Sequence, residues 1–170
     1  MSSSEPRSRR AALASALATL VAAGLGGCGF ALRRPPQMSF SSVALTGFDA
    51  HSPLRHELQR QLEQQLKVLD APDRAEVVLQ ALVDARERSI VASTSAAQVR
   101  EVQLRLRFTF RAQTPAGREL MPRAELLVAR DLSYQESAAL AKEHEEAELF
   151  RDMQDEMVAQ VLRRLAAVHV

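Results

Sequence analysis

Hydrophobic and polar residues alternate most clearly in the segment VQLRLRFTFR, residues 102–111. Successive side chains of a strand point to opposite faces of a sheet, so this strict alternation predicts a β-strand with one buried face. The expected buried row is Val102, Leu104, Leu106, Phe108 and Phe110, and the expected open row is Gln103, Arg105, Arg107, Thr109 and Arg111. The pattern therefore predicts a sheet that is apolar on one side and rich in arginine on the other.

Three further segments predict strands. A β-branched and aromatic segment covers Ser39–Leu45, the segment 75–91 changes to a two-residue period, and a strand running to about Ser133 follows a turn at residues 114–118. Pro122 lies early in that last strand, and because proline lacks an N–H, it predicts a bulge or an edge position there.

Two stretches show helical spacing. Ser52 and Pro53 suit the N-cap and the first helical position of a helix that ends before Pro72. Its apolar stripe is Leu54, Leu58, Leu62, Leu66 and Leu69. Ser133 and Glu136 match a capping box, which opens a second helical region. The apolar stripe of that region is Phe150, Met153, Met157, Val161 and Leu165.

The order of these elements is strand, helix, three strands, helix. Two helices with one apolar stripe each can cover one face of a sheet, which predicts an α+β two-layer sandwich. The expected sheet has four strands and is mostly antiparallel, within a single domain over residues 38–170. The chain has no Trp and one Tyr, so the core must consist mainly of Leu, Val, Ala and Met.

The N-terminal segment has the layout of an export signal. Arg7, Arg9 and Arg10 precede an apolar run over 11–23, and small residues lead to Cys28, the only cysteine of the chain. This arrangement predicts a lipoprotein signal peptide over 1–27, an acylated Cys28 and an extended tether over 28–37. An ordinary signal peptide or a membrane-anchoring helix, with an incidental cysteine, is the alternative.

Charge is distributed unevenly along the rest of the chain. Residues 74–130 contain ten basic and six acidic side chains, whereas residues 131–170 contain four basic and nine acidic ones. The positive middle part suggests a segment that meets anions, although interleaved surface charge gives the same count.

The residues that could carry chemistry favour binding over catalysis. The four histidines are scattered, and neither a phosphate-binding loop nor a nucleophile elbow is present, so we expect no enzyme activity, no metal and no cofactor. Arg105, Arg107 and Arg111 are either a solvated polar face or a surface that binds phosphate, carboxylate or a partner protein. Nucleic acid is not an expected ligand, because Phe108 and Phe110 alternate onto the apolar face.

Several segments together resemble the LPS-assembly lipoprotein LptE family. They are CGFALR after the signal, VQLRLRFTFRAQTPAGREL, and above all RDLSYQESAALAKEHEEAELFRDMQDEMVAQVLRRL. The resemblance implies a small α+β lipoprotein on the periplasmic side of the outer membrane, lodged in the lumen of a large β-barrel, LptD, in a 1:1 complex. It implies that the lipoprotein plugs the barrel, assists its assembly and takes part in inserting lipopolysaccharide into the outer leaflet.

The resemblance also implies residues for lipopolysaccharide binding. Lys142 falls where the family has a basic residue linked to this binding. The loop ASTSAAQ, residues 92–98, is where a second basic contact is expected, and since it has none, Arg88 or Arg100 would replace it. Arg105, Arg107 and Arg111 join them as candidates. The other class of function is a stand-alone periplasmic lipoprotein that binds a ligand or acts as an envelope enzyme.

Overall fold

Five strands form one mixed sheet in the computed structural model, which describes residues 36–93, 99–133 and 139–170. The strands are β1 (Ser42–Thr46), β2 (Lys67–Val68), β3 (Val77–Ser93), β4 (Val99–Gln113) and β5 (Glu119–Ser133), in the spatial order β2-β1-β3-β4-β5. β1 is parallel to both of its neighbours, whereas β3, β4 and β5 are antiparallel. The α+β class is confirmed, but the prediction of four strands is wrong and the sheet is not purely antiparallel.

The fifth strand arises because the first helix is shorter than its leucines suggested. Helix α2 covers Pro53–Leu62, and Ser52 caps it as predicted, with its hydroxyl oxygen accepting from the Arg55 N–H at 3.0 Å. The chain then turns, and the N–H of Lys67 donates to the carbonyl of Ser41 at 3.0 Å. Leu66 still packs against the core, so a helical spacing continues where the backbone is no longer helical. A short 3-10 helix, η1 (Pro72–Arg74), leads into β3.

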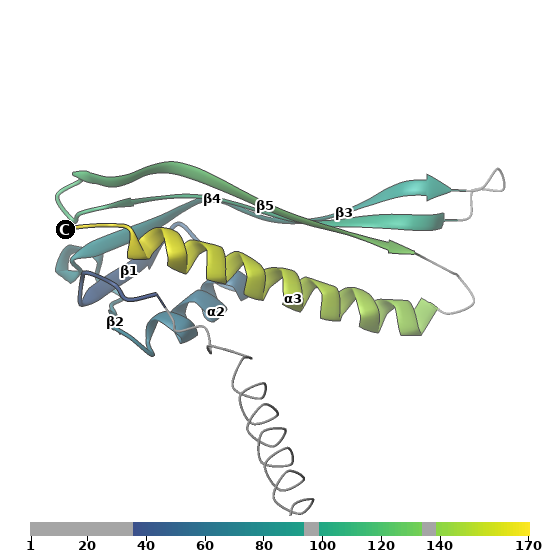
Figure 1. The fold of residues 1–170 in the computed structure, drawn as a ribbon, viewed down its shortest axis with the longest axis horizontal. Coiled ribbons are helices and arrows are strands. Elements are labelled where there is room, and N and C mark those ends of the chain that lie inside the picture. Colours follow the sequence, from purple (N-terminus) through teal and green to yellow (C-terminus); the bar gives the residue numbers. More distant parts are fainter. Residues whose placement is uncertain (1–35, 94–98, 134–138) are drawn as a thin grey trace, which may run out of the picture. The chain divides into compact units, whose positions relative to one another are not determined.

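Both long helices lie on one face of the sheet (Figure 1). Helix α3 covers Ala139–Ala166 and runs beneath β4 and β5. All five residues of its predicted apolar stripe are buried, which confirms the stripe. Ser133 is the last residue of β5, and Glu136 lies outside the described residues, so the predicted capping box stays a prediction.

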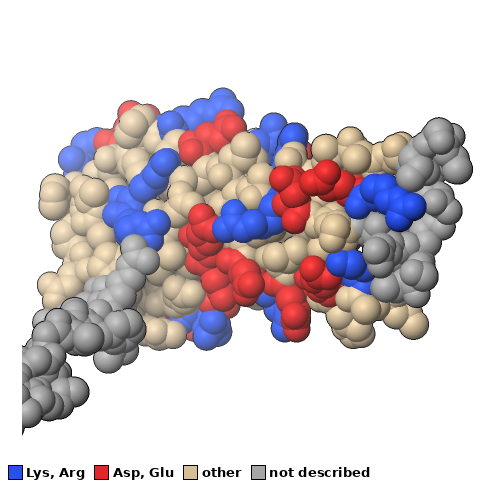
Figure 2. Space-filling view, turned by 45° about the vertical axis from the view of Figure 1, so that its right-hand side comes forward, with Lys and Arg blue, Asp and Glu red and all other residues tan. Residues whose placement is uncertain are grey.

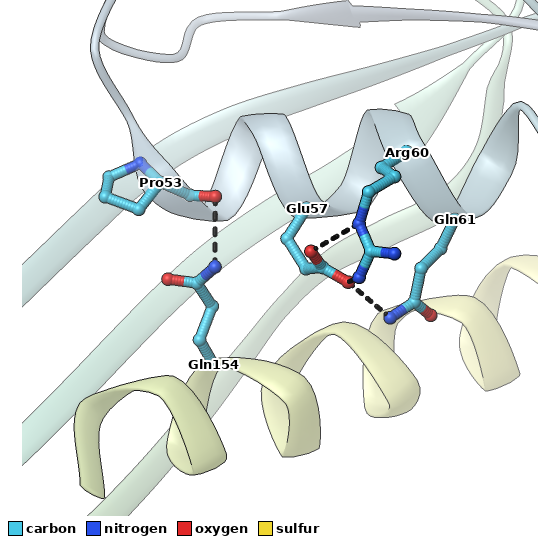
Figure 3. A network of polar contacts seen from close by, with 5 residues as sticks. All are labelled: Pro53, Glu57, Arg60, Gln61 and Gln154. Carbon is cyan, nitrogen blue, oxygen red and sulfur yellow. Dashed lines mark hydrogen bonds and ion pairs between the residues drawn. The ribbon is translucent and has the colours of Figure 1, made fainter. Parts of the chain in front are cut away.

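Polar contacts join the two helices and order α2 (Figure 3). The side-chain amide of Gln154 on α3 donates to the carbonyl of Pro53 at 3.1 Å, at the start of α2. Within α2, the carboxylate of Glu57 accepts hydrogen bonds from Arg60 and Gln61. The hydrogen bond with Arg60 lowers the pKa of Glu57 and raises the pKa of Arg60, because each charge stabilises the other.

Two irregularities in strand pairing set the faces of the sheet. Between Ala81 and Val83 the pairing with β4 shifts, so Leu82 is an extra residue in β3 and the alternation of β3 changes there. A second shift, near Pro122, inserts an extra residue into β5, which is an edge strand. The bulge and the edge position predicted from Pro122 are both confirmed.

The core lies between the sheet and the helices. Its largest fully buried side chains include Phe108, Phe110, Leu58, Met153 and Met157. Phe108 stacks on Phe48 and on Phe110, with ring centroids 5.6 and 4.8 Å apart. Apart from Phe40 and Phe150, aliphatic side chains and methionine fill the rest of the core, as the composition indicated.

Candidate functional site

The sheet face opposite the helices carries the predicted arginine row. Paired residues of antiparallel strands point to the same side, and Phe108 and Phe110 point into the core, so Arg105, Arg107 and Arg111 point away from it. In the part of the chain that the structure describes, no helix covers this side (Figure 1). We call it the open face.

Polar side chains of the same and of neighbouring strands hold the arginines of the open face. Arg107 forms an ion pair with Glu87 of β3 at 2.7 Å, and the Nε of Arg111 donates to Gln80 at 2.8 Å. Arg105 donates to Gln103, whose amide in turn donates to Asp131 of β5 at 2.8 Å. The open face is therefore a mixed ladder of charged and amide side chains, and its arginines do not form an uncompensated cationic patch.

The other basic candidates lie on the helix side or at the end of the hairpin. Arg88 of β3 pairs with Glu146 of α3 at 3.1 Å, and Lys142 pairs with Glu145 at 2.7 Å. Lys142 and Glu146 are one turn apart on the same face of α3. Arg100 is exposed, at the third irregularity of the β3–β4 pairing. The structure thus divides the six candidates into the open-face set Arg105, Arg107 and Arg111 and the hairpin-end set Arg88, Arg100 and Lys142.

The sequence did not indicate that β3 turns charges toward α3. From Asp84 onward the even-numbered residues of β3 pair with Leu104, Leu106 and Phe108, so they point to the helix side. Asp84 accepts from the hydroxyl of Ser52, and the guanidinium of Arg86 lies 3.5 Å from the ring centroid of Phe150. The bulge at Leu82 causes this reversal, and it is hidden in the sequence by the apolar run around it.

A small hollow lies where α2, α3 and β3 meet. Its volume is about 40 Å³. The residues that line it include Leu54, Asp84, Arg86, Phe150 and Met157. Most of its lining residues are apolar, and its charged lining residues are Asp84, Arg86 and Arg107.

Acidic side chains gather along α3 (Figure 2). They are Glu143, Glu145, Glu146, Glu148, Asp152, Asp155 and Glu156. Glu146 pairs with Arg88 of β3 and Glu156 with Arg130 of β5 at 2.6 Å. Part of the positive charge in the middle of the chain is therefore balanced by the negative charge near its end.

Four predictions concern residues that lie wholly or mostly outside the described ranges. Cys28 and the signal segment 1–27 lie outside the described residues, as do most of the tether 28–37 and most of the loop 92–98. In the described ranges, no helix is long and apolar enough to cross a membrane. Within the same ranges, no group of three or more His, Cys, Asp or Glu side chains is placed to hold a metal ion.

Comparison with known proteins identifies a family. The family model LptE, described as lipopolysaccharide-assembly, matches residues 40–165. The solution structure of uncharacterized lipoprotein B from Nitrosomonas europaea is 30% identical, with a TM-score of 0.70, over 82% of this chain and 91% of that chain. No curated protein matches the chain.

Two crystal structures share the fold at lower identity. Rare lipoprotein B from Shewanella oneidensis is 24% identical with a TM-score of 0.62, over 75% of this chain and 95% of that one. A minor lipoprotein from Acinetobacter baumannii is 21% identical with a TM-score of 0.63, over 76% of this chain and 93% of that one. Both similarities are evidence for the fold alone.

Proposed function

This chain belongs to the LptE family of lipopolysaccharide-assembly proteins, and from that membership we propose that it is a lipoprotein that plugs a large outer-membrane β-barrel of the LptD type. In this role it assists the assembly of the barrel and the insertion of lipopolysaccharide into the outer leaflet. It acts by binding and positioning, without catalysis and without a cofactor.

The open face is the observation that supports a plug. The lumen of a membrane β-barrel is polar, so a protein inside it needs a polar surface that is already satisfied by its own partners. The open face has this character, since Arg107 pairs with Glu87, and Gln103 links Arg105 to Asp131. An apolar face of the same size would instead favour association with lipid or aggregation.

The hairpin-end set is the proposed contact with lipopolysaccharide. Its lipid A and inner-core sugars carry phosphates and carboxylates, which guanidinium and ammonium groups bind through charge-assisted hydrogen bonds. Lys142 is largely covered, with 17% of its side chain exposed, and is held by Glu145. A phosphate would take the place of that carboxylate. Arg88, which contacts Glu146 one turn from Lys142, would supply further positive charge, and Arg100 would add charge at the end of the hairpin.

Acylated Cys28 is the proposed membrane anchor. One acyl chain binds a bilayer only marginally, whereas two or more chains hold a protein there stably. Removal of residues 1–27 would leave Cys28 as the first residue, and the tether up to residue 37 would connect it to the domain. The expected location is the periplasmic side of the outer membrane.

Co-purification tests the plug directly. The full chain with a C-terminal tag is extracted from native outer membranes in mild detergent, and proteins recovered in stoichiometric amount are identified. One large β-barrel at 1:1 is the expected result. Recovery of the chain alone, from membranes that contain the barrel, would refute the plug.

The alternative, a stand-alone ligand binder or envelope enzyme, calls for a pocket. Sites for small molecules usually have volumes of roughly 300–1,000 Å³ and are largely apolar. The apolar hollow between α2, α3 and β3 is far smaller, at about 40 Å³. A larger depression of about 340 Å³ lies on the outer surface of α3, but it is shallow and lined by four charged residues.

A further inference from the structure

A row of apolar side chains crosses the sheet near the end of the β3–β4 hairpin. Val102 of β4 pairs with Ile90 of β3 on one side and with Leu132 of β5 on the other. Paired residues of antiparallel strands share a face, and Val102 belongs to the core, so all three point to the helix side. Val102 and Leu132 are buried, whereas Ile90 is 58% exposed. We call these three residues the apolar row, and it ends at an exposed side chain of β3.

The part of α3 next to this end of the sheet has a polar inner stripe (Figure 1). In residues 139–149, the half-buried side chains are Ala139, Lys142, Glu146 and Leu149. Their spacing of three and four residues continues the stripe of Phe150 and Met153, which faces the core. Charged side chains of the helix therefore face a sheet surface that is apolar. Such departures from ordinary core packing are expected at functional sites.

Positive charge lies directly beside the apolar row. In the next row of the sheet, Leu104 pairs with Arg88 of β3. Arg88 is two residues from Ile90 on the same side of the strand, a separation of about 7 Å. Arg88 contacts Glu146 of α3 at 3.1 Å, and Lys142 lies one turn before Glu146. Apolar and cationic side chains are thus adjacent at this end of the molecule.

Two more exposed apolar side chains lie at the same end. Val91 is the extra residue at the second irregularity of the β3–β4 pairing, and Leu140 belongs to the first turn of α3. Together with Ile90 they make up three of the six large hydrophobic side chains that are exposed among the described residues. Single exposed apolar residues are common, whereas several at one place indicate a binding surface.

We propose that the apolar row receives an acyl chain of lipopolysaccharide, while a phosphate of the same molecule lies at Lys142 and Arg88. This inference rests on the proposed function, and it adds the apolar part of the ligand to the contact of the hairpin-end set. The acyl chain lies against Ile90 and enters beneath residues 139–149 of α3, so the polar inner stripe moves away from the row. Burial of apolar surface favours this exchange, and exposed ion pairs oppose it only weakly.

Charge complementarity favours lipopolysaccharide over a phospholipid as the source of the acyl chain. The hairpin-end set has three basic side chains, and carboxylates of α3 hold Arg88 and Lys142. A phospholipid headgroup brings a single phosphate, whereas lipid A and the inner-core sugars bring several anionic groups beside the acyl chains. Several anions on one molecule compete better with the carboxylates, because the later contacts are intramolecular.

Photocrosslinking in native outer membranes tests the contact without detergent, which would compete for an apolar site. The photoreactive amino acid p-benzoylphenylalanine replaces Ile90 in the full tagged chain. In the matched control it replaces Leu127, which is also 58% exposed but lies on the open face. We expect a lipopolysaccharide adduct with a yield about tenfold higher at Ile90, because crosslinking requires direct contact. Mass spectrometry of the adduct should place the new bond on an acyl chain.

A charge reversal tests whether the phosphate and the acyl chain belong to one ligand. Lys142→Glu, combined with the probe at residue 90, should lower the adduct yield about tenfold, because the phosphate loses its cation. Arg151→Glu is the matched control, since Arg151 pairs with Glu148 on α3 as Lys142 does with Glu145. An unchanged yield with Lys142→Glu would overturn the shared site.

Two substitutions of Glu146 test whether the acyl chain enters beneath α3. Both remove the ion pair between α3 and Arg88. Glu146→Leu also places an apolar side chain against the apolar row, so it should lower the adduct yield about threefold, because a filled site cannot hold the acyl chain. Glu146→Gln should not lower the yield. Equal yields for the two variants would confine the acyl chain to Ile90 and refute its entry beneath the helix.

Each other outcome overturns a specific statement. An adduct on the sugars alone refutes the acyl contact and leaves the proposed lipopolysaccharide contact intact. An adduct with a phospholipid or with the barrel shows another occupant, and our assignment is then wrong. Absence of an adduct at Ile90, in a chain that still recovers the barrel, refutes this inference alone. A parent chain that recovers no barrel refutes the plug instead.

Discussion

The two ends of α3 rest on the same sheet in different ways. All seven buried residues of the helix lie between Phe150 and Leu165, and none lies in residues 139–149. We call residues 150–165 of α3, together with β1, β2, α2 and the strand segments they cover, the near half. The far half consists of residues 83–93, 99–107, 127–133 and 139–149.

Ion pairs and a cation–π contact add to the apolar packing in the far half, whose strands contribute Val102, Leu104 and Leu132 to the core. Arg88 pairs with Glu146 at 3.1 Å, and Arg86 lies over Phe150 at the boundary between the halves. Exposed ion pairs contribute little free energy, at most about 1 kcal/mol each, whereas a buried aromatic side chain contributes several times more. Helix α3 therefore contributes its buried side chains in the near half, whereas its far-half segment contacts β3 through an ion pair of small free energy.

The largest effect should come from the core of the near half. Phe108→Ala removes a fully buried ring stacked between Phe48 and Phe110, so we expect the free energy of unfolding to fall by about 3–5 kcal/mol. Urea denaturation of the full chain measures this. Leu127→Ala is the control, because Leu127 is 58% exposed on the open face, and its effect should be within about 0.5 kcal/mol. Equal losses would remove the distinction between the halves.

Two glycines with positive φ allow the energetic cost of a close contact to be compared with that of backbone strain alone. Gly47 has a φ of +78°, and a Cβ there would lie 2.2 Å from the carbonyl oxygen of Ala81. Gly117 has a φ of +86°, with no atom within 4 Å of such a Cβ. Gly117→Ala should therefore cost about 1–2 kcal/mol from the left-handed backbone alone, and Gly47→Ala clearly more, because β1 must also move away from β3. Denaturation of both variants measures the two losses in free energy of unfolding. A smaller loss for Gly47→Ala than for Gly117→Ala would contradict the close approach of Gly47 to the carbonyl of Ala81.

Local patterns predicted the buried faces of α3 and β4 well. The stripe from Phe150 to Leu165 and the alternation at 102–111 each arise because one face of the element is buried. A single buried face produces a regular spacing of apolar residues, which the sequence shows directly. The predicted first helix was longer than α2. Leu62 and Leu66 keep a helical spacing, although the N–H of Lys67 already donates to Ser41 in the sheet. A two-residue strand such as β2 has no periodicity of its own, so tertiary pairing alone determines it.

The far half was harder to predict, because one bulge in β3 reverses which of its residues point to the helix side and which to the open face. Arg88 reads as an open-face residue if β3 alternates without interruption from Val77, but the extra residue Leu82 turns it toward α3. The six candidate residues were therefore all found in sequence, while their separation into two sets was not. The point where β1 stops pairing with β3, at Thr46 and Gln80, was also not predicted, because the sequence does not indicate it.

Charge reversal at the two candidate sets should separate their ligands. Lys142→Glu places a negative charge beside Glu145 and Glu146, so we expect affinity for lipopolysaccharide to fall about tenfold. Arg105→Glu with Arg107→Glu alters the open face and should change this affinity less than threefold, while reducing recovery of the barrel. Binding of purified lipopolysaccharide by the full chain at fixed salt measures the first effect. A larger loss of affinity for the double variant would indicate that lipopolysaccharide binds to the open face.

The ion pair of the far half should matter locally rather than globally. Glu146→Gln removes the ion pair between α3 and Arg88, and we expect amide exchange in residues 139–149 to become faster by a factor equivalent to about 0.5–1 kcal/mol. Exchange in residues 150–165 should remain unchanged. Raising the salt from about 0.1 M to about 1 M should produce a similar local effect in the parent, because the screening length falls from about 10 Å to about 3 Å.

Glu143→Gln is the control for this experiment. Glu143 belongs to the same segment of α3 but forms no ion pair with a described residue. Exchange that responds equally to Glu143→Gln and Glu146→Gln would mean that helix charge, and not the contact with Arg88, determines the stability of this segment.

The smallest effect should be a change in acid stability within the near half. The carboxylate of Glu76 accepts hydrogen bonds from the hydroxyl and the N–H of Ser41, which lower its pKa in the folded protein. A carboxyl group with a lowered folded pKa stabilises the protein fully above its unfolded pKa of about 4.3, and this contribution disappears as the pH falls through the folded value. Glu76→Gln should therefore be less stable than the parent at pH 7, and the difference should shrink as the pH falls from about 5 toward 3.

Denaturation midpoints across that pH range measure the difference in stability, with Glu119→Gln as an exposed control. A difference that stays constant with pH would show that the Glu76 carboxylate does not link β3 to the start of β1 through its charge.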